Sequence, residues 1–151
     1  MPSSSSSSRQ IHGTVVALAG QGVLLRGRPG SGKSDLALRL IERGGRLVAD
    51  DRVDLTLRRG RVVAAAPRAL AGLIEARGVG IVAVPRRARA PLALVADLTD
   101  RARVERMPAP DRCVLLGVSL PRLRLAPFEA SAPIKLRLAL AGIRRKGRRR
   151  P

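Results

Sequence analysis

Aromatic side chains are almost absent from this sequence, which has no tryptophan, no tyrosine and a single phenylalanine, Phe128. Proteins that bind single-stranded nucleic acid stack bases on aromatic rings, so this scarcity argues against that class. A nucleotide base would also find little surface on which to stack. We therefore expect a bound nucleotide to be recognised through its phosphates and a metal ion, with weak discrimination between bases.

Cysteine is nearly absent as well. The single Cys113 excludes an internal disulfide and any multi-cysteine metal site. It lies in the apolar run Cys113–Leu116, which predicts a buried thiol. No stretch is long enough for a transmembrane helix, and the N-terminus has no apolar signal core. These absences predict a cytoplasmic protein that has no membrane anchor.

Acidic residues are also few: 11 Asp and Glu stand against 30 Lys and Arg, for a formal charge of +19. This balance favours anionic partners such as nucleotides or acidic protein faces, and we expect no nucleic-acid partner because aromatic residues are not interleaved with the cations. The length of 151 residues and the hydrophobic content of 45% predict a single globular domain.

One segment fits the phosphate-binding pattern G-x-x-x-x-G-K-S/T. It consists of Gly27, Arg28, Pro29, Gly30, Ser31, Gly32, Lys33 and Ser34. Glycines let a backbone curl so that successive N–H groups point at an anion. Lys33 would reach the β- and γ-phosphates, and the Ser34 hydroxyl would bind Mg²⁺.

The residues around this segment separate a nucleotide site from a chance glycine-rich turn. The apolar run Val23–Leu25 precedes it, as a buried strand should, and apolar residues follow at helical spacing at positions 36, 37, 40 and 41. The N-terminus of that helix would lie beneath the phosphates. The sequence therefore predicts a site for a nucleoside triphosphate.

The remaining pattern predicts an α/β fold with a mixed, partly antiparallel sheet and flanking helices. We expect a disordered serine-rich lead-in over 1–10, a folded domain built around the glycine-rich phosphate-binding segment over 11–143 and a frayed basic tail over 144–151. Strands are expected at 14–18, 23–26, 46–49, 53–57, 61–65, 81–84, 92–98 and 114–120, with a hairpin leading into the glycine-rich segment. Helices are expected from Lys33 to about Arg43, over 67–75 and over 134–143.

Several polar residues could complete a site. Asp50 and Asp51 follow a predicted strand, where ligands of α/β sheets collect; one could serve a metal and the other accept a proton. His12, the only histidine, could assist proton transfer. Glu75 could bind Mg²⁺ and Arg77 could meet phosphoryl charge. Each of these residues could equally be an ordinary solvated side chain.

Taken together and in order, these motifs resemble the C-terminal domain of the HPr kinase/phosphorylase family. The resemblance rests on His12–Gly13, Gly27–Ser34, Arg46–Val53, Glu75–Ile81 and Leu116–Pro121, and it extends from His12 to about Ile143. It implies a P-loop fold similar to phosphoenolpyruvate carboxykinase. The implied reaction is ATP-dependent phosphorylation of a serine on HPr, the small phosphocarrier of the phosphotransferase system, and removal of that phosphate with inorganic phosphate as acceptor.

The resemblance also implies roles for individual residues. Lys33 and Ser34 would hold phosphates and Mg²⁺, and Glu75 would be a further acid at the metal. Asp51 matches the acceptor of the serine proton, with Asp50 and His12 beside it. Arg106, in the segment Val104–Met107, is the best match to a catalytic arginine.

Two departures from the family stand out. The N-terminal domain of its longer members has no counterpart here, so regulation and assembly need not follow the family, and whether the chain forms a homo-oligomer stays open. The family's arginine-containing loop before the last helix corresponds to 126–131, which has no arginine, although Arg122 and Arg124 lie just upstream. We expect kinase activity with weak or absent phosphorylase activity. The alternatives are a P-loop kinase acting on a small metabolite and a nucleotide-sensing module without catalysis.

Overall fold

The computed structural model describes residues 7–149, and for residues 147–149 it describes the backbone alone. Its elements are the strands β1 (Ser8–His12), β2 (Thr14–Leu18), β3 (Gln21–Arg26), β4 (Arg46–Ala49), β5 (Arg52–Arg58), β6 (Arg61–Ala65), β7 (Leu73–Ala76), β8 (Gly80–Ala83), β9 (Arg89–Leu98), β10 (Asp111–Leu115) and β11 (Val118–Leu125), the helices α2 (Lys33–Glu42) and α3 (Ala132–Arg149), and the short 3-10 helices η1 (Arg68–Leu70) and η2 (Arg101–Arg103).

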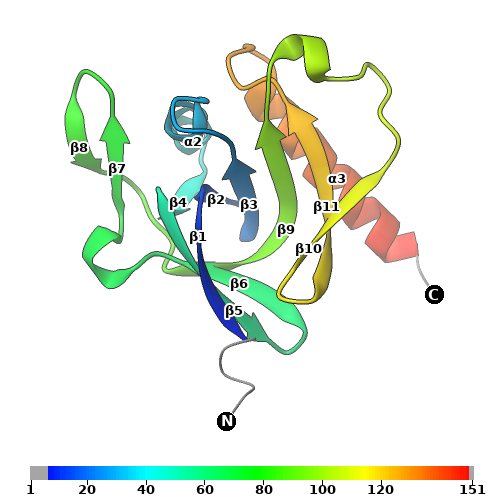
Figure 1. The fold of residues 1–151 in the computed structure, drawn as a ribbon, viewed down its shortest axis with the longest axis horizontal. Helices are drawn as coiled ribbons and strands as arrows, with labels where there is room; N and C mark the ends of the chain where they lie inside the picture. Colours follow the sequence, from blue (N-terminus) through cyan, green and yellow to red (C-terminus); the bar gives the residue numbers. More distant parts are fainter. Residues whose placement is uncertain (1–6, 150–151) are drawn as a thin grey trace.

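Nine of these strands form one curled sheet of mixed direction (Figure 1). The order is β1-β5-β6-β9-β3-β2-β4, and β11 and β10 join it through β9. The start of β9 pairs antiparallel with β6, while its remainder pairs parallel with β3 and β11. Because β9 changes partners along its length, the sheet folds over on itself. The predicted α/β fold with a mixed sheet is confirmed.

The central strands are buried on both faces because each face has its own cover. Val16 and Leu25 belong to a core shared with the helices, to which α2 contributes Leu36 and α3 contributes Leu136. Alternate residues of the same strands point to the other face, where the core includes side chains from β5, β6, β10 and β11. Runs of consecutive apolar residues are the expected result for strands enclosed in this way.

Helix α2 has clear signals at both ends. Gly32 precedes it in the left-handed region, at φ 100°. Leu36, Ala37 and Leu40 are its buried residues, at the spacing of one helical face. After the helix, Gly44 has φ 100° and donates its N–H to the carbonyl of Ile41 at 3.0 Å. The predicted end near Arg43 is confirmed.

Tight turns join three of the hairpins, and one of them corrects a prediction. Each turn places a residue of positive φ before a glycine: Ala19–Gly20, Arg59–Gly60 and Leu116–Gly117. The single strand expected over 114–120 is therefore wrong, because the turn at Leu116–Gly117 divides that run between β10 and β11. The sequence does not reveal this turn clearly, because Gly117 is typical of turns but Leu116 is not.

The helix expected over 67–75 is also wrong. This segment forms η1 and then β7, and between them Gly72 has φ 75°, which interrupts a helix. The strand expected at 81–84 exists as β8, but it is not buried, and Ile81 is 71% exposed. The reason is that β7 and β8 form a separate two-stranded hairpin, which stands apart from the main sheet in Figure 1.

Both predicted domain boundaries fall inside regular elements. The expected lead-in ends at Gln10, yet β1 begins at Ser8 and pairs with β5. The expected tail begins at Arg144, yet α3 continues to Arg149, because arginine and lysine are good helix formers. Residues 1–6 and 150–151 of these two predicted segments lie outside the described part of the chain. Among the described residues, no helix combines the length and apolar character that crossing a membrane requires.

Candidate active site

The glycine-rich loop, residues 27–34, connects β3 to α2 at the carboxyl end of β3 (Figure 1). A Cβ at Gly27 would lie 2.3 Å from the Ser31 hydroxyl oxygen, so a larger residue there would disrupt the turn. Gly30 has φ 81°, and a Cβ there would meet no atom within 4 Å, so this side of the loop is open. The Ser31 oxygen is buried and has no hydrogen-bond partner among the described residues. A curled backbone with an open side and an unpaired hydroxyl fits the oxygens of a phosphate group.

Lys33 is the first residue of α2 and holds the loop in shape. Its Nζ donates to the carbonyl of Gly27 at 2.8 Å and to that of Arg28 at 3.1 Å. The ammonium group therefore lies across the glycine-rich loop, where the sequence predicts that it reaches bound phosphates. Together with the N-terminus of α2, it makes the electrostatic environment of this loop favourable for an anion.

Asp50 connects the loop to the sheet. Its Oδ1 accepts hydrogen bonds from Ser34 Oγ at 3.0 Å and from Thr14 Oγ1 at 2.9 Å, and Asp50 is one of the few buried polar residues in the described part of the chain. Both hydroxyls donate to Oδ1, and no hydroxyl within residues 7–149 donates to Oδ2. A hydroxyl and a carboxylate at this distance are suitable oxygen ligands for Mg²⁺.

Asp51 and His12 lie beside Asp50, at the point where the chain passes from β4 to β5. Asp51 has φ 69°, an unusual conformation that aspartate tolerates better than most residues, and its side chain is exposed. The N–H of Gly13 donates to the carbonyl of Asp51 at 3.2 Å. His12 is the register partner of Arg52. The structure therefore places the backbone of His12 and Gly13 beside that of Asp51 and Arg52, and the role of His12 at the site stays a prediction.

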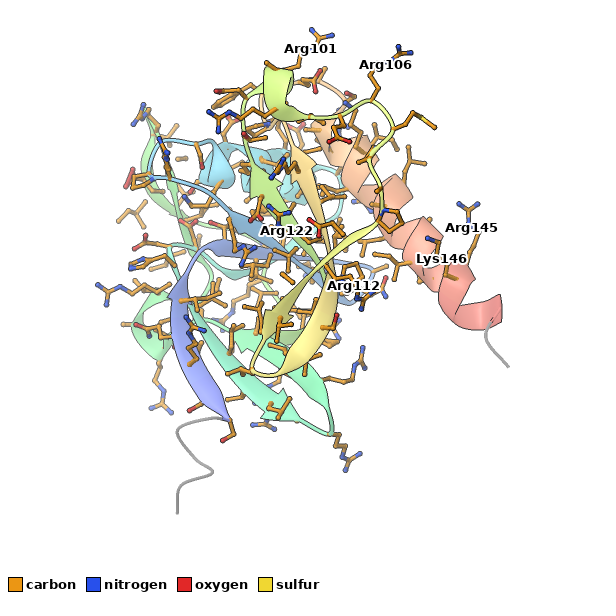
Figure 2. The ribbon with its side chains drawn as sticks, turned by 45° about the vertical axis from the view of Figure 1, so that its right-hand side comes forward. Arg101, Arg106, Arg112, Arg122, Arg145 and Lys146 are labelled. Atoms are coloured by element: carbon orange, nitrogen blue, oxygen red, sulfur yellow. The ribbon has the colours of Figure 1, made fainter. Side chains whose placement is uncertain are left out.

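Other predicted site residues lie on segments that project from the sheet. Glu75 is exposed on β7, and Arg77 is exposed in the turn of the β7–β8 hairpin. Arg106 is exposed in the segment between η2 and β10, and Figure 2 shows its side chain pointing away from the fold. Within the described residues, no three acids, histidines or cysteines are clustered so as to hold a metal ion. The structure thus gathers Ser34 and Asp50 but does not group Glu75 with other acids.

Sequence analysis missed the position of Phe128. The aromatic ring lies against the glycine-rich loop, so that a Cβ at Gly32 would come within 2.9 Å of it. Arg39 of α2 holds this segment by donating to the carbonyl of Glu129 at 3.2 Å and to that of Pro127. Arg39 also forms an ion pair within the helix with Asp35, four residues earlier.

The sequence analysis also missed a group of ion pairs. It links β3, the strand before the glycine-rich loop, to β9, β10 and β11. Arg26 donates to Asp97 through Nε at 2.7 Å and through NH2 at 3.0 Å. Arg122 also donates to Asp97 and forms an ion pair with Asp111. Burial alone would raise the pKa of Asp97, but the hydrogen bonds from the two arginines outweigh it and lower that pKa. The hydrogen bonds that Arg26 donates to Asp97 raise the pKa of Arg26, and the one that Arg122 donates to Asp111 lowers the pKa of Asp111.

The only available signal for this ion-pair network was a set of charged residues next to apolar runs, as Arg26 is next to Val23–Leu25. Pairing between β3, β9 and β11 brings these residues together, and the sequence does not reveal which strands pair. Cys113, predicted to be buried, is only half-buried, and burial raises the pKa of its thiol.

Comparison with known proteins matches this arrangement to one family. Residues 3–89 match the model of the HPr Serine kinase C-terminal domain. The HPr kinase/phosphorylase of Clostridium tetani is 46% identical over 76 residues, which are 50% of this chain and 25% of that protein. The corresponding protein of Lactobacillus acidophilus is 52% identical over 75 residues, 49% of this chain and 23% of that protein. The matched part of the chain thus spans about a quarter of the length of these curated relatives.

A solved structure extends the likeness beyond that segment. It is titled "Structure of the Hpr(Ser) kinase/phosphatase from Coxiella burnetii", and it has a TM-score of 0.82 and 25% sequence identity. The likeness covers 93% of this chain and 99% of the other, so the two folds correspond through α3 as well. With the family model matching more than half of the sequence, this chain belongs to the HPr serine kinase C-terminal domain family.

Proposed function

We propose that this chain is an ATP-dependent serine kinase whose acceptor is an HPr-like phosphocarrier protein, built on a P-loop fold similar to phosphoenolpyruvate carboxykinase. The observation that carries the proposal is the hydrogen bond between Ser34 Oγ and Asp50 Oδ1 at 3.0 Å, directly behind the glycine-rich loop. P-loop enzymes hold Mg²⁺ with a serine or threonine of the loop and an aspartate from a neighbouring strand.

The residues divide the work of binding among them. The N–H groups of the glycine-rich loop would bind the phosphates, and Lys33 would exchange its carbonyl partners for the β- and γ-phosphates. Ser34 and Asp50 would hold Mg²⁺, and Glu75 would contribute a further acid from the β7–β8 hairpin. The metal ion, when bound, would neutralise charge on the phosphate oxygens.

Asp51 is our proposed proton acceptor. The serine oxygen of the acceptor protein would attack the γ-phosphorus as its proton passes to the Asp51 carboxylate, and the bond to the β-phosphate oxygen would break to release ADP. Asp51 is exposed, as a group that must meet a second protein should be, while its carbonyl is held by Gly13. His12 beside it would orient this acid, and Arg77 and Arg106 would supply positive charge to the transferring group.

We propose that the phosphorylase reaction is weak or absent. The segment 126–131 has no arginine to bind inorganic phosphate. Of the two arginines just upstream, Arg122 is already engaged by Asp97 and Asp111, which leaves it little capacity for a free anion, and Arg124 lines a cavity that includes no residue of 126–131.

The test is transfer of labelled phosphate from ATP to HPr in the presence of Mg²⁺. We expect label on a serine of HPr, lost in Lys33→Ala and in Asp51→Asn. Matched controls are Lys135→Ala, which removes an exposed lysine of α3, and Asp54→Asn, which changes a half-buried aspartate of β5. Hydrolysis without transfer to HPr would instead indicate a kinase for a small metabolite, and binding without turnover would indicate a nucleotide sensor. Rapid release of pyrophosphate from phosphorylated HPr and inorganic phosphate would refute the proposal on the phosphorylase reaction.

A further inference from the structure

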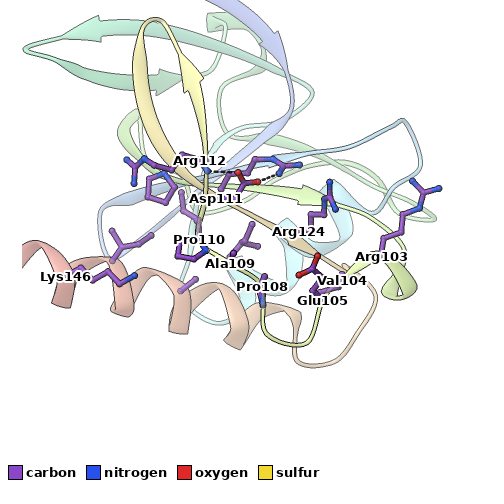
Figure 3. Close-up of a pocket in the computed structure, with 16 residues that line it drawn as sticks. Arg103, Val104, Glu105, Pro108, Ala109, Pro110, Asp111, Arg112, Arg124 and Lys146 are labelled. Atoms are coloured by element: carbon purple, nitrogen blue, oxygen red, sulfur yellow. Dashed lines mark hydrogen bonds and ion pairs between the residues drawn. The ribbon is translucent and has the colours of Figure 1, made fainter.

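A cavity of about 760 Å³ lies between β9, β11, α3 and the segment that leads into β10 (Figure 3). This volume is within the range of cavities that bind small molecules, roughly 300–1,000 Å³. Its lining includes no residue of the glycine-rich loop and neither Asp50 nor Asp51. The cavity is therefore separate from the proposed kinase site and needs its own explanation.

The wall of the cavity is largely apolar. Its apolar side chains come from all four segments: Leu94, Val104, Pro108, Ala109, Pro110, Pro121, Leu123, Ala139 and Ile143. Three prolines within this set restrict the backbone, so this part of the wall is already shaped before a ligand arrives. A ligand here would bury an apolar body, which is the main source of affinity in such sites.

Positive charge surrounds this apolar wall. Five cationic residues line the cavity (Arg103, Arg112, Arg122, Arg124 and Lys146), against the two acids Glu105 and Asp111. Figure 3 shows Arg103 and Arg124 near one end and Lys146 near the other. The apolar wall would complement the apolar body of a ligand, and the cations at the two ends of the cavity would complement its negative group.

The cations differ in their availability. Arg122 is bound by Asp97 and Asp111, and Arg112 donates to Ser119 Oγ at 2.7 Å. In the described part of the chain, Arg124 and Lys146 take part in no hydrogen bond or ion pair, and both are exposed at the mouth of the cavity. Two cations without partners beside an apolar cavity can bind an anion without first breaking a bond.

We propose that this cavity is a binding site for a small organic anion with an acyl or aryl body and a carboxylate, in which Lys146 at one end binds the carboxylate and Arg124 at the other end adds positive potential. The proposal does not rest on the kinase function. An acidic peptide would use the same cations, but a cavity of this volume bounded by four chain segments suits a small molecule better than an extended chain.

The experiment uses the fluorescent anion 8-anilinonaphthalene-1-sulfonate with the full chain. We expect saturable binding with one site, displaced by decanoate. Lys146→Glu should weaken binding by about fivefold and the double variant with Arg124→Glu by more than tenfold, because each reversal replaces an attraction with a repulsion. Arg145→Glu is the matched control, since Arg145 is the neighbouring exposed cation of α3 and does not line the cavity (Figure 2).

A second pair of variants tests the cavity itself. Ala139→Trp places an indole in the cavity and should abolish binding, while Leu138→Trp adds the same side chain to an exposed position next to it. Thermal unfolding of every variant shows whether it is folded, so loss of binding is read only in folded protein. Unchanged binding in Ala139→Trp would overturn the cavity as the site.

The chemistry of the ligand is tested by competition. Equal affinity for the neutral probe N-phenyl-1-naphthylamine, together with no effect of Lys146→Glu, would overturn the requirement for an anion. Displacement of the fluorescent anion by an oligoglutamate peptide but not by decanoate would assign the surface to an acidic protein segment and overturn the small-molecule site.

Discussion

Ser34 Oγ and Asp50 Oδ1 lie 3.0 Å apart and join the start of α2 to the end of β4. Thr14 donates to the same carboxylate oxygen from β2, at 2.9 Å. Two hydroxyls, one from β2 and one from α2, therefore hold the acid in place. The orientation of Asp50 is fixed by β2 and α2 before any ligand binds, which is the arrangement that a metal ligand requires.

Removing the Thr14 hydroxyl should cost stability. Thr14 is fully buried, so Thr14→Val keeps the shape of the side chain but leaves the Asp50 oxygen with one fewer donor, at a cost of about 1–3 kcal/mol. Urea unfolding measures this cost. Thr56→Val is the control, because the Thr56 hydroxyl reaches its carbonyl partner only at 3.5 Å and should contribute little. Equal losses in the two variants would contradict a specific role for the Thr14–Asp50 contact.

Gly32→Ala should weaken the glycine-rich loop. The new Cβ would meet the Phe128 ring at 2.9 Å, and an alanine at φ 100° is strained, so we expect a loss of about 1–2 kcal/mol in stability together with weaker nucleotide binding. Isothermal titration with ATP and thermal unfolding measure the two effects.

A double variant separates the two causes of that loss. Adding Phe128→Ala to Gly32→Ala removes the clash but not the strain, so recovery should be partial. Gly142→Ala is a control in which stability should rise instead of fall. Gly142 lies in α3, and a Cβ there would meet no atom within 4 Å, so the alanine should stabilise the helix by about 0.5–1 kcal/mol. Full recovery in the double variant would show that backbone conformation contributes nothing.

Stability should depend on pH through Asp97. Its pKa is lowered in the folded chain, so its ion pairs with Arg26 and Arg122 contribute stability above the unfolded pKa of about 3.9, and this contribution is lost as pH falls through the lower folded pKa. Asp97→Asn should therefore lose about 2 kcal/mol between pH 5 and 8, and the difference from the wild type should shrink below about pH 4.

Chemical unfolding at several pH values measures this dependence. Asp54→Asn provides the comparison, since Asp54 is also a strand residue but accepts its hydrogen bond from the neutral side chain of Gln10. A difference between wild type and Asp97→Asn that stays constant down to pH 2 would contradict the assigned shift.

The thiol of Cys113 should react slowly. Burial raises its pKa, so less of it is the reactive thiolate near neutral pH than in a free cysteine. We expect iodoacetamide at pH 8 to modify the folded protein more slowly than a short cysteine peptide, and urea to remove the difference. Cys113→Ser, which has no thiol, gives the background of the measurement. A rate of modification in the folded protein equal to that of the peptide would contradict this prediction.

The glycine-rich loop and the elements beside it could be predicted because their signals are local. The segment Gly27–Ser34 has a fixed spacing, and β4 and α2 end at Ala49 and Glu42, shortly before the polar Asp50 and the glycine Gly44. The predicted pairing of β2 with β3 was also local, since only the turn at Ala19–Gly20 separates them.

The remaining features depend on contacts between distant residues. Arg26 and Asp97 meet because β3 pairs in parallel with β9, and parallel pairing has no local signature. Residues 70, 73 and 74 have the apolar spacing of a helix. The chain instead forms the strand β7 here, which buries Ile74 against the helices. The position of Phe128 depends on Arg39, which lies 89 positions earlier in the chain and holds the carbonyls of Pro127 and Glu129.

The ammonium group of Lys33 already bridges two carbonyls of its own loop. An incoming phosphate, if this loop binds one as proposed, would therefore meet an ordered segment and would take over a donor that already has acceptors. Recognition at this loop would then be an exchange of one acceptor for another, in which a polyanion would displace neutral oxygens by its charge. A neutral guest of the same shape would have no such advantage and would leave the lysine where it is.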